Sequence, residues 1–252
     1  MRVGLVSLVV ATSTAAWADE SAQEIARKAR ERGGLNLLNL VAELKLTTTA
    51  KEGAPKEQVL SSASRKVEGR TRSILRFAQP ASVSGVAVLT VEGQGGAASD
   101  MSLYLPKLKR VQKVAQGERG KSFMSTDFNY ADLGGTGGDD AQMKRDADQK
   151  VDGRDAYVLS GPAGADSPYG DVMLFVDKET FVPLRVEYKD KDGKPFKSFR
   201  ALKLKKFKDR TLAGESVMEN LQSGSKTQLE ILRIEDSKLG DEAFSERALE
   251  RG

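Results

Sequence analysis

The chain has 252 residues, 40 basic and 36 acidic side chains, and neither cysteine nor histidine. Without those two residue types it cannot contain a serine–histidine triad, a thiol nucleophile or a zinc site with histidine or cysteine ligands. The nearly balanced charge also argues against the strongly basic surface by which proteins bind nucleic acids. We therefore expect a non-enzymatic protein with no cofactor, no metal site and no nucleic-acid partner.

The N-terminal residues have the features of a cleaved signal peptide. Arg2 supplies a positive charge, residues 3–11 form an apolar run, and Ala16-Trp17-Ala18 supplies the small side chains that signal peptidase requires. The apolar run is much shorter than the about 20 residues that span a bilayer. We expect residues 1–18 to direct export to the periplasm of a Gram-negative type of cell. Residues 19–252 carry no repeat or linker and are expected to form one domain.

Two helical patterns lie near the ends of this domain. Residues 21–32 predict a short helix that Ser21 can cap, because a capping side chain accepts a hydrogen bond from the first turn. The tail at residues 241–252 predicts one more helical turn, with Phe244 and Leu249 as apolar anchors.

Between these ends, apolar and polar residues alternate as is typical of β-strands. Leu44 and Leu46 follow this pattern, and Asp152-Gly153 and Asp192-Gly193 are turn signals between later strands. Many short strands with such turns predict an antiparallel barrel or sandwich. The expected strands also include residues 59–67, 71–77, 85–91, 101–105, 109–115, 146–150, 157–160, 172–176, 184–189, 196–207, 216–221 and 227–234.

One glycine-rich segment, residues 117–138, departs from the strand pattern and predicts a long loop with a short helix. It carries four large side chains without clean alternation: Phe123, Met124, Phe128 and Tyr130. Two interpretations stay open. The loop either plugs the end of the barrel with side chains, or forms a lid over an apolar cavity, where such side chains adapt to acyl chains.

The same region contains the acidic residues that a hydrolase would need. Asp139 and Asp140 are adjacent, and adjacent side chains of an extended segment point in opposite directions. Asp127 and Asp132 are surrounded by aromatic residues, but loop carboxylates commonly accept backbone hydrogen bonds. We expect hydrogen-bonding roles for Asp127 and Asp132. A hydrolase that uses Asp127, Asp132 or Asp139 is the least favoured hypothesis for the function, behind the carrier and the adaptor described below.

Two basic stretches cover residues 107–113 and 197–210. In the second stretch Leu202 and Leu204 alternate with lysines, which predicts a strand with one buried and one solvated face. We interpret both stretches as charged outer surface that also protects sheet edges from pairing. Contact with anionic lipid headgroups or with an acidic partner is the alternative.

Three sequence blocks resemble signature blocks of the periplasmic outer-membrane lipoprotein-sorting (LolA-like) family. They are GVAVLT at residues 85–90, DMSLYLPKLKRVQKV at 100–114 and KSFMSTDFNYADL at 121–133. Further matches in the same order are FAQP at residues 77–80, LFVDKETFVPL at 174–184 and FSERAL at 244–249. Two positions depart from the family pattern. Ser125-Thr126 replaces a Gly-Ser pair, and Ser102 stands where the family usually has tryptophan. Because a lost tryptophan removes a large buried surface, we expect from Ser102 a wider or differently built cavity wall.

The resemblance implies a mostly β protein with one curved antiparallel half-barrel domain. A short N-terminal helix and a covering loop or helix would lie on its concave side. It also implies a carrier for lipids or lipoprotein acyl chains between the inner and outer membranes, with an inner-membrane exporter and an outer-membrane acceptor as possible partners. A non-enzymatic adaptor that docks on a lipid exporter of the RND/MMPL type, without carrying cargo, is the alternative.

The expected lipid-binding residues are the large loop side chains together with inward strand residues. Periodicity alone does not decide which face of each strand is concave, because a shift of one residue exchanges the faces. The expected residues are Val86, Val88, Leu103, Leu105, Phe123, Met124, Phe128 and Tyr130.

Cleavage after Ala18 removes Trp17, the one tryptophan of the sequence. The exported protein is therefore expected to begin at Asp19 and to lack tryptophan emission. N-terminal sequencing and an emission spectrum of the exported protein check both statements, and an intact Trp17 would contradict them.

Overall fold

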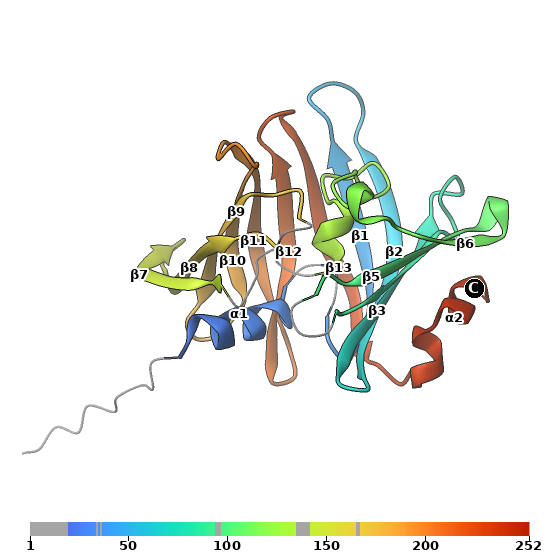
Figure 1. The fold of residues 1–252 in the computed structure, drawn as a ribbon, viewed down its shortest axis with the longest axis horizontal. Helices are drawn as coiled ribbons and strands as arrows, with labels where there is room; N and C mark the ends of the chain where they lie inside the picture. The colour runs from blue at the N-terminus through green and yellow to red at the C-terminus, as the bar shows by residue number, and fades with distance from the viewer. Residues whose placement is uncertain are drawn as a thin grey trace, which may run out of the picture.

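Thirteen antiparallel strands form one continuous, strongly curved sheet (Figure 1). The computed structural model describes residues 20–33, 35, 37–93, 97–134, 142–164 and 167–251. The expected signal peptide and the Asp139-Asp140 pair lie outside the described residues. The strands are β1 (Leu40–Thr49), β2 (Lys56–Val67), β3 (Arg70–Gln79), β4 (Ala87–Val91), β5 (Asp100–Leu105), β6 (Arg110–Lys113), β7 (Lys144–Val151), β8 (Arg154–Pro162), β9 (Asp171–Asp177), β10 (Pro183–Lys189), β11 (Pro195–Phe207), β12 (Arg210–Asn220) and β13 (Ser225–Asp236).

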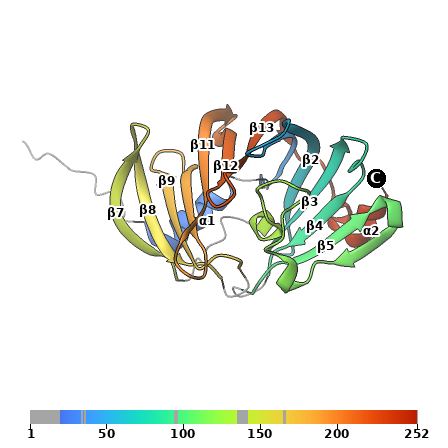
Figure 2. The ribbon, with the colours of Figure 1, turned by 90° about the horizontal axis from the view of Figure 1, so that it is seen from above.

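The strand order explains the open shape of the sheet. Neighbouring strands follow one another in the chain except at the centre, where β1 pairs with β13, so the order is β6-β5-β4-β3-β2-β1-β13-β12-β11-β10-β9-β8-β7. The edge strands β6 and β7 are therefore consecutive in the chain. The described part of their connection, residues 114–134, lies on the concave side of the sheet (Figure 2). The fold is the curved half-barrel that the family resemblance implied.

Helix α1 (Ala22–Arg30) covers part of the concave side (Figure 2). Ser21 caps it as predicted, because its hydroxyl accepts a hydrogen bond from the Glu24 backbone N–H at 3.2 Å. Its apolar stripe, including Ile25 and Ala29, is fully buried in the main core of the protein. Among the described residues, no helix has the length and apolar character needed to cross a bilayer.

The main core lies between the concave face of the sheet and the elements that cover it. Alternate residues of β1, including Leu44 and Leu46, are fully buried there, as the alternating pattern predicted. Leu75 and Phe77 of β3 face the same core, whereas Ile74 packs in a second cluster on the convex face.

The C-terminal tail covers the convex face with two short helices, η5 (Asp241–Phe244) and α2 (Glu246–Glu250). Phe244 and Leu249 are fully buried beside Leu89, so the predicted anchor role of both residues is confirmed. Arg76 of β3 also donates hydrogen bonds to the Ala248 and Leu249 carbonyl oxygens at 3.0 and 3.1 Å. The tail is thus fixed on the outside of the sheet.

The expectation that Leu202 shares a buried face with Leu204 is wrong. Leu202 is 46% exposed, and Leu204 packs against a small cluster on the convex face. The β11–β12 register shifts between Ala201 and Lys203 and again between Lys203 and Leu204. A bulge inserts an extra residue, so strict alternation of the two faces is lost.

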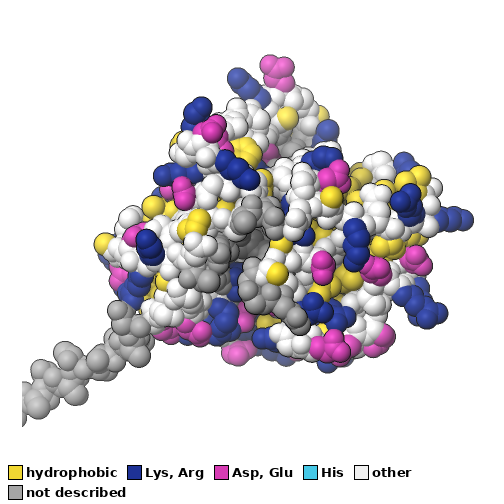
Figure 3. Space-filling view, in the orientation of Figure 1, with side chains coloured by type: hydrophobic (Ala, Val, Ile, Leu, Met, Phe, Trp, Pro, Cys, Tyr) yellow, Lys and Arg dark blue, Asp and Glu magenta, His cyan; other side chains and the backbone are white. Residues whose placement is uncertain are grey.

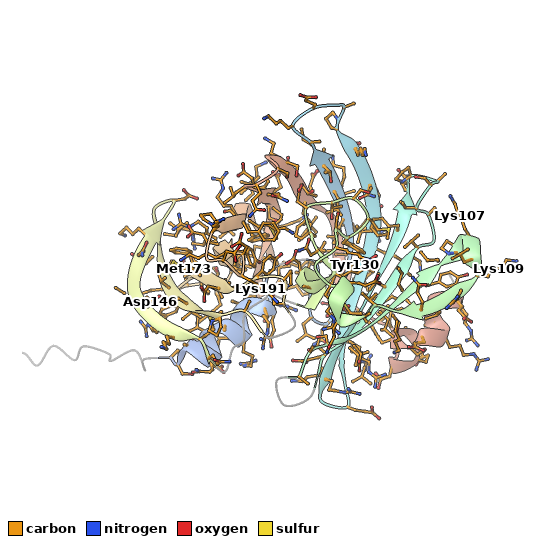
Figure 4. The ribbon with its side chains drawn as sticks, turned by 45° about the horizontal axis from the view of Figure 1, so that its top comes forward. Lys107, Lys109, Tyr130, Asp146, Met173 and Lys191 are labelled. Carbon is orange, nitrogen blue, oxygen red and sulfur yellow. The ribbon has the colours of Figure 1, made fainter. Side chains whose placement is uncertain are left out.

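The first basic stretch lies at the β5–β6 hairpin, at the edge of the sheet. Lys107 and Lys109 point away from the body of the protein (Figure 4), and Leu108 between them is 64% exposed. Elsewhere on the face shown in Figure 3, basic and acidic side chains are interspersed. The stretch is therefore charged outer surface at an edge, as the sequence predicted.

The inference drawn from Ser102 is also wrong. Ser102 faces the convex side, where its hydroxyl donates a hydrogen bond to the Glu246 carboxylate at 2.7 Å. Lys113 of β6 forms an ion pair with the same carboxylate at 2.6 Å. Because this position points away from the concave face, its side chain holds α2 and does not shape a cavity wall.

The anchor role of the tail gives a stability prediction. Phe244→Ala should lower the free energy of unfolding by about 3 kcal/mol, because it leaves a cavity in a fully buried cluster. Urea denaturation measures this change. Leu239→Ala, at a residue that is 39% exposed, is the control and should change the free energy of unfolding by less than about 0.5 kcal/mol. Equal effects of the two substitutions would contradict the anchor role.

Candidate functional site

A cavity of about 200 Å³ lies between α1, the strands and the segment that connects β6 to β7. Its buried apolar lining comes mainly from distant parts of the chain, namely Leu35, Phe128, Leu133, Val186, Tyr188, Phe199 and Met218. More polar and charged side chains line the remainder, including Arg30, Glu31, Lys66 and Glu92. The cavity is therefore amphipathic.

Residues 122–134, which we call the lid, form a compact loop on the concave side. Within it, the Phe123 N–H donates a hydrogen bond to the Phe128 carbonyl oxygen at 2.7 Å. The last part of the lid is the short helix η3 (Tyr130–Gly134). Phe123 is fully buried, and its ring centroid lies 5.3 Å from that of Phe77 and 5.6 Å from that of Tyr130. Tyr130 points into the region between the two halves of the sheet (Figure 4).

The lid departs from the family pattern at a strained position. Met124 and Ser125 have φ angles of 49° and 63°, in the left-handed region that favours glycine. Ser125 is the residue that stands where the resembling family usually has glycine. The substitution therefore places a side chain at a backbone position where glycine is less strained, and it changes the lid, not the cavity wall.

Buried Lys197 of β11 anchors the lid to the sheet. Its ammonium donates to the Asp127 carbonyl oxygen at 2.6 Å and to the Asn129 Oδ1 at 2.7 Å, and lies 3.8 Å from the Asp132 carboxylate. Only 2% of the side chain is exposed. The interpretation of the second basic stretch as wholly solvated surface is thus wrong at Lys197, because this position faces the concave side.

Both lid carboxylates accept hydrogen bonds, as predicted. Asp127 accepts one from the Thr227 hydroxyl at 2.7 Å and another from the Ser225 hydroxyl, so it ties the lid to β13. Asp132 accepts from the Tyr169 hydroxyl at 2.7 Å and from the Asn129 N–H at 2.6 Å. Through these hydrogen bonds, the two carboxylates hold the lid in position.

Burial sets the electrostatics of this network. It raises the pKa of Asp132, although Lys197 and the hydrogen bonds from Asn129 and Tyr169 oppose that shift. It likewise lowers the pKa of Lys197, which the two nearby aspartates oppose. Each charge therefore depends on the other, since removal of one partner leaves an uncompensated buried charge.

All eight expected lipid-binding residues lie in or against the main core. Val86, Val88, Leu103, Phe123, Phe128 and Tyr130 are buried in it, and Leu105 and Met124 are partly buried against it. Of the eight, only Phe128 lines the cavity; the other seven belong to the main core or pack against it. The wall formed by β10 to β12, including Val186, Phe199 and Met218, was not among the predicted binding residues, although Val186 and Phe199 each lie between two polar residues.

The open, curved antiparallel sheet with a covered concave face is the fold of the LolA-like class. A family model described as "Uncharacterized protein" matches residues 69–251, and the chain belongs to this family. No curated protein matches the chain in sequence.

Three solved structures are similar to this chain. An outer membrane lipoprotein-sorting protein domain from Vibrio parahaemolyticus is 27% identical, with a TM-score of 0.80 over 91% of this chain and 98% of that chain. A DUF1329 family protein from Desulfovibrio piger is 22% identical, with a TM-score of 0.81 over 90% and 97%. A LolA superfamily protein from Nitrosomonas europaea is 21% identical, with a TM-score of 0.69 over 91% and 99%. The last two show the shared fold.

The buried ion pair of Lys197 with Asp132 predicts how stability depends on pH. Lys197→Met should lower the free energy of unfolding by about 3–5 kcal/mol at neutral pH, because Asp132 loses its buried counter-charge. Without Lys197 the pKa of Asp132 rises further, and a raised carboxyl pKa stabilises the folded state at low pH and loses that effect as pH rises. The loss of unfolding free energy in the variant should therefore shrink as pH falls toward about 4, which is the unperturbed pKa of an aspartate side chain.

Denaturation of both proteins at several pH values measures the deficit. Lys203→Met is the matched control, because this lysine of the same strand is exposed and pairs with Glu215 on the outer face. It should change the free energy of unfolding by less than about 1 kcal/mol. A deficit of Lys197→Met that is small, or that grows as pH falls, would contradict the anchor role.

Proposed function

We propose that the protein is a periplasmic carrier that holds the acyl chains of lipids or lipoproteins and moves them between the inner and outer membranes. In this proposal residues 1–18 are a cleaved signal peptide and residues 19–252 act as one half-barrel domain. The family membership and the fold support a lipid-binding role. The direction of movement and the compartment are parts of the proposal.

The observation that carries the proposal is the way the apolar concave face is covered. The lid lies over it without joining the sheet as a strand, and the isolated bridge between Ser122 and Asn129 is internal to the lid. Its attachment depends on side-chain contacts such as those of Lys197 and Thr227. A cover of this kind can move without breaking the hydrogen bonds between strands.

The cavity volume indicates that the lid must move when cargo binds. About 200 Å³ is below the about 300–1,000 Å³ of typical ligand sites. Displacement of Phe128 and Leu133, which both line the cavity, would enlarge it. Each CH₂ group removed from water contributes about 0.8 kcal/mol, so a long acyl chain can offset the loss of lid contacts.

The adaptor hypothesis is less well supported. An adaptor without cargo needs an interior filled by its own side chains, whereas this interior keeps a cavity beside a separable lid. The hydrolase hypothesis loses support as well, because Asp127 and Asp132 are occupied by hydrogen bonds that position the lid.

Native mass spectrometry of the protein purified from its host should detect a bound amphiphile. Purified protein should also take up a fluorescent fatty-acid probe, and Val186→Phe should reduce this uptake at least about tenfold because the larger side chain fills the cavity. Val158→Phe, at an equally buried residue on the convex face, is the matched control and should leave uptake unchanged. Absence of both a co-purified amphiphile and probe uptake would refute the carrier function.

A further inference from the structure

Three hydroxyl side chains form a row across one wall of the cavity. Ser64 of β2 pairs with Ser73 of β3, and Ser73 pairs with Thr90 of β4. All three line the cavity and are at most 5% exposed. Directly paired residues of antiparallel strands have Cβ atoms about 5 Å apart, so the row presents evenly spaced hydroxyls across three strands.

The hydroxyl of Ser64 has no hydrogen-bond partner within the part of the chain that the structure describes. The residue is fully buried, and a buried polar atom without a partner destabilises the folded state. By contrast, the nearby Ser62 hydroxyl donates to the Leu35 carbonyl oxygen at 2.5 Å. The Ser62 hydroxyl is therefore used within the protein, whereas Ser64, two residues further along the strand, lines the cavity and has a hydroxyl without a partner.

The rows on either side of the hydroxyls form a gradient of polarity along the strands. On one side, Ser62 pairs with Leu75, Leu75 with Val88 and Val88 with Leu103, so the row is apolar from β3 to β5; it belongs to the main core beside the cavity and does not line it. On the other side, Lys66 pairs with Thr71, whose N–H donates to the Glu92 carboxylate at 2.7 Å. Successive rows on one face are about 6.6 Å apart, because each residue advances a strand by about 3.3 Å.

We propose that the hydroxyl row binds the carbonyl oxygens of acyl ester or amide groups. The order of the rows matches the order of groups in an acylated amphiphile, namely hydrocarbon, carbonyl linkage and polar head. A carbonyl beside Ser64 accepts the hydrogen bond that this hydroxyl lacks. The head then lies beside Lys66 and Glu92, and the chain extends into the apolar part of the cavity. This inference rests on the proposed carrier function and specifies the ligand class and its orientation.

A pair of phospholipids with the same head and the same chain length tests the proposal. One probe is a diacyl phosphatidylcholine with ester linkages, and the other is its dialkyl ether counterpart, which lacks both carbonyl groups. The wild-type protein should bind the ester about five- to tenfold more tightly, since a net hydrogen bond contributes roughly that factor. Titration of the delipidated protein with each probe measures the preference.

The triple variant Ser64→Ala, Ser73→Ala, Thr90→Val removes the hydroxyls with little change in side-chain volume. It should bind the ether as the wild type does and lose the preference for the ester. Ser216→Ala is the matched control, because Ser216 is buried on β12 but does not line the cavity, and it should keep the preference. No preference in the wild type, or a preference retained by the triple variant, overturns the inference. Binding of neither phospholipid would instead refute the carrier function itself.

A second measurement does not depend on cargo. Ser64→Ala should raise the Tm of the ligand-free protein by about 2–4 °C, because it removes a buried hydroxyl that has no partner. The same substitution should weaken binding of the ester probe. A lower Tm would mean that the hydroxyl is already hydrogen-bonded in the ligand-free protein, and that result would overturn the assignment of Ser64.

Discussion

The edge strands β6 and β7 follow one another in the chain, yet residues 122–134 between them lie on the concave side of the sheet. A hairpin at this point would give a more closed sheet, with the connecting residues outside it. Because the segment turns inward, its aromatic side chains become part of the core. Two main features of the concave side depend on this route of the chain: the lid and the cavity beside it.

A cover that must both exclude water and open needs contacts that are specific but few. The lid combines apolar burial of Phe123 with polar anchors from Lys197 and Thr227. Apolar contacts alone are non-directional, so they do not define one position of a loop. Hydrogen bonds from a buried ammonium do, because their geometry is narrow and an unsatisfied buried charge is strongly unfavourable. The polar network therefore determines where the lid lies, and burial of the apolar side chains supplies much of the free energy that holds the lid against the sheet.

The two faces of the sheet use the same kinds of side chain for different purposes. On the convex face, the Ser102 hydroxyl and the Arg76 Nη2 hold the C-terminal tail through hydrogen bonds, although the Arg76 Nη1 has no partner among the described residues. On the concave face, Ser64 is buried without a partner, although native proteins rarely leave buried hydroxyls unsatisfied. A fold can tolerate such a group where a ligand completes its hydrogen bonding. Stability and binding are then expected to change in opposite directions at that residue.

The sequence by itself determined the strands, the capped helix and the anchors Phe244 and Leu249, because each depends on a local period or a local hydrogen bond, whereas the export signal stays a prediction. It also placed Phe128 in a loop of functional interest. Only the tertiary structure decided that Lys197 is buried, that Leu202 is exposed, and that Ser64, Ser73 and Thr90 share one row. Bulges and strand register set these facts, and both depend on pairing between segments that are distant in the chain. The alternation of residues along one strand does not specify which strand it pairs with or in which register.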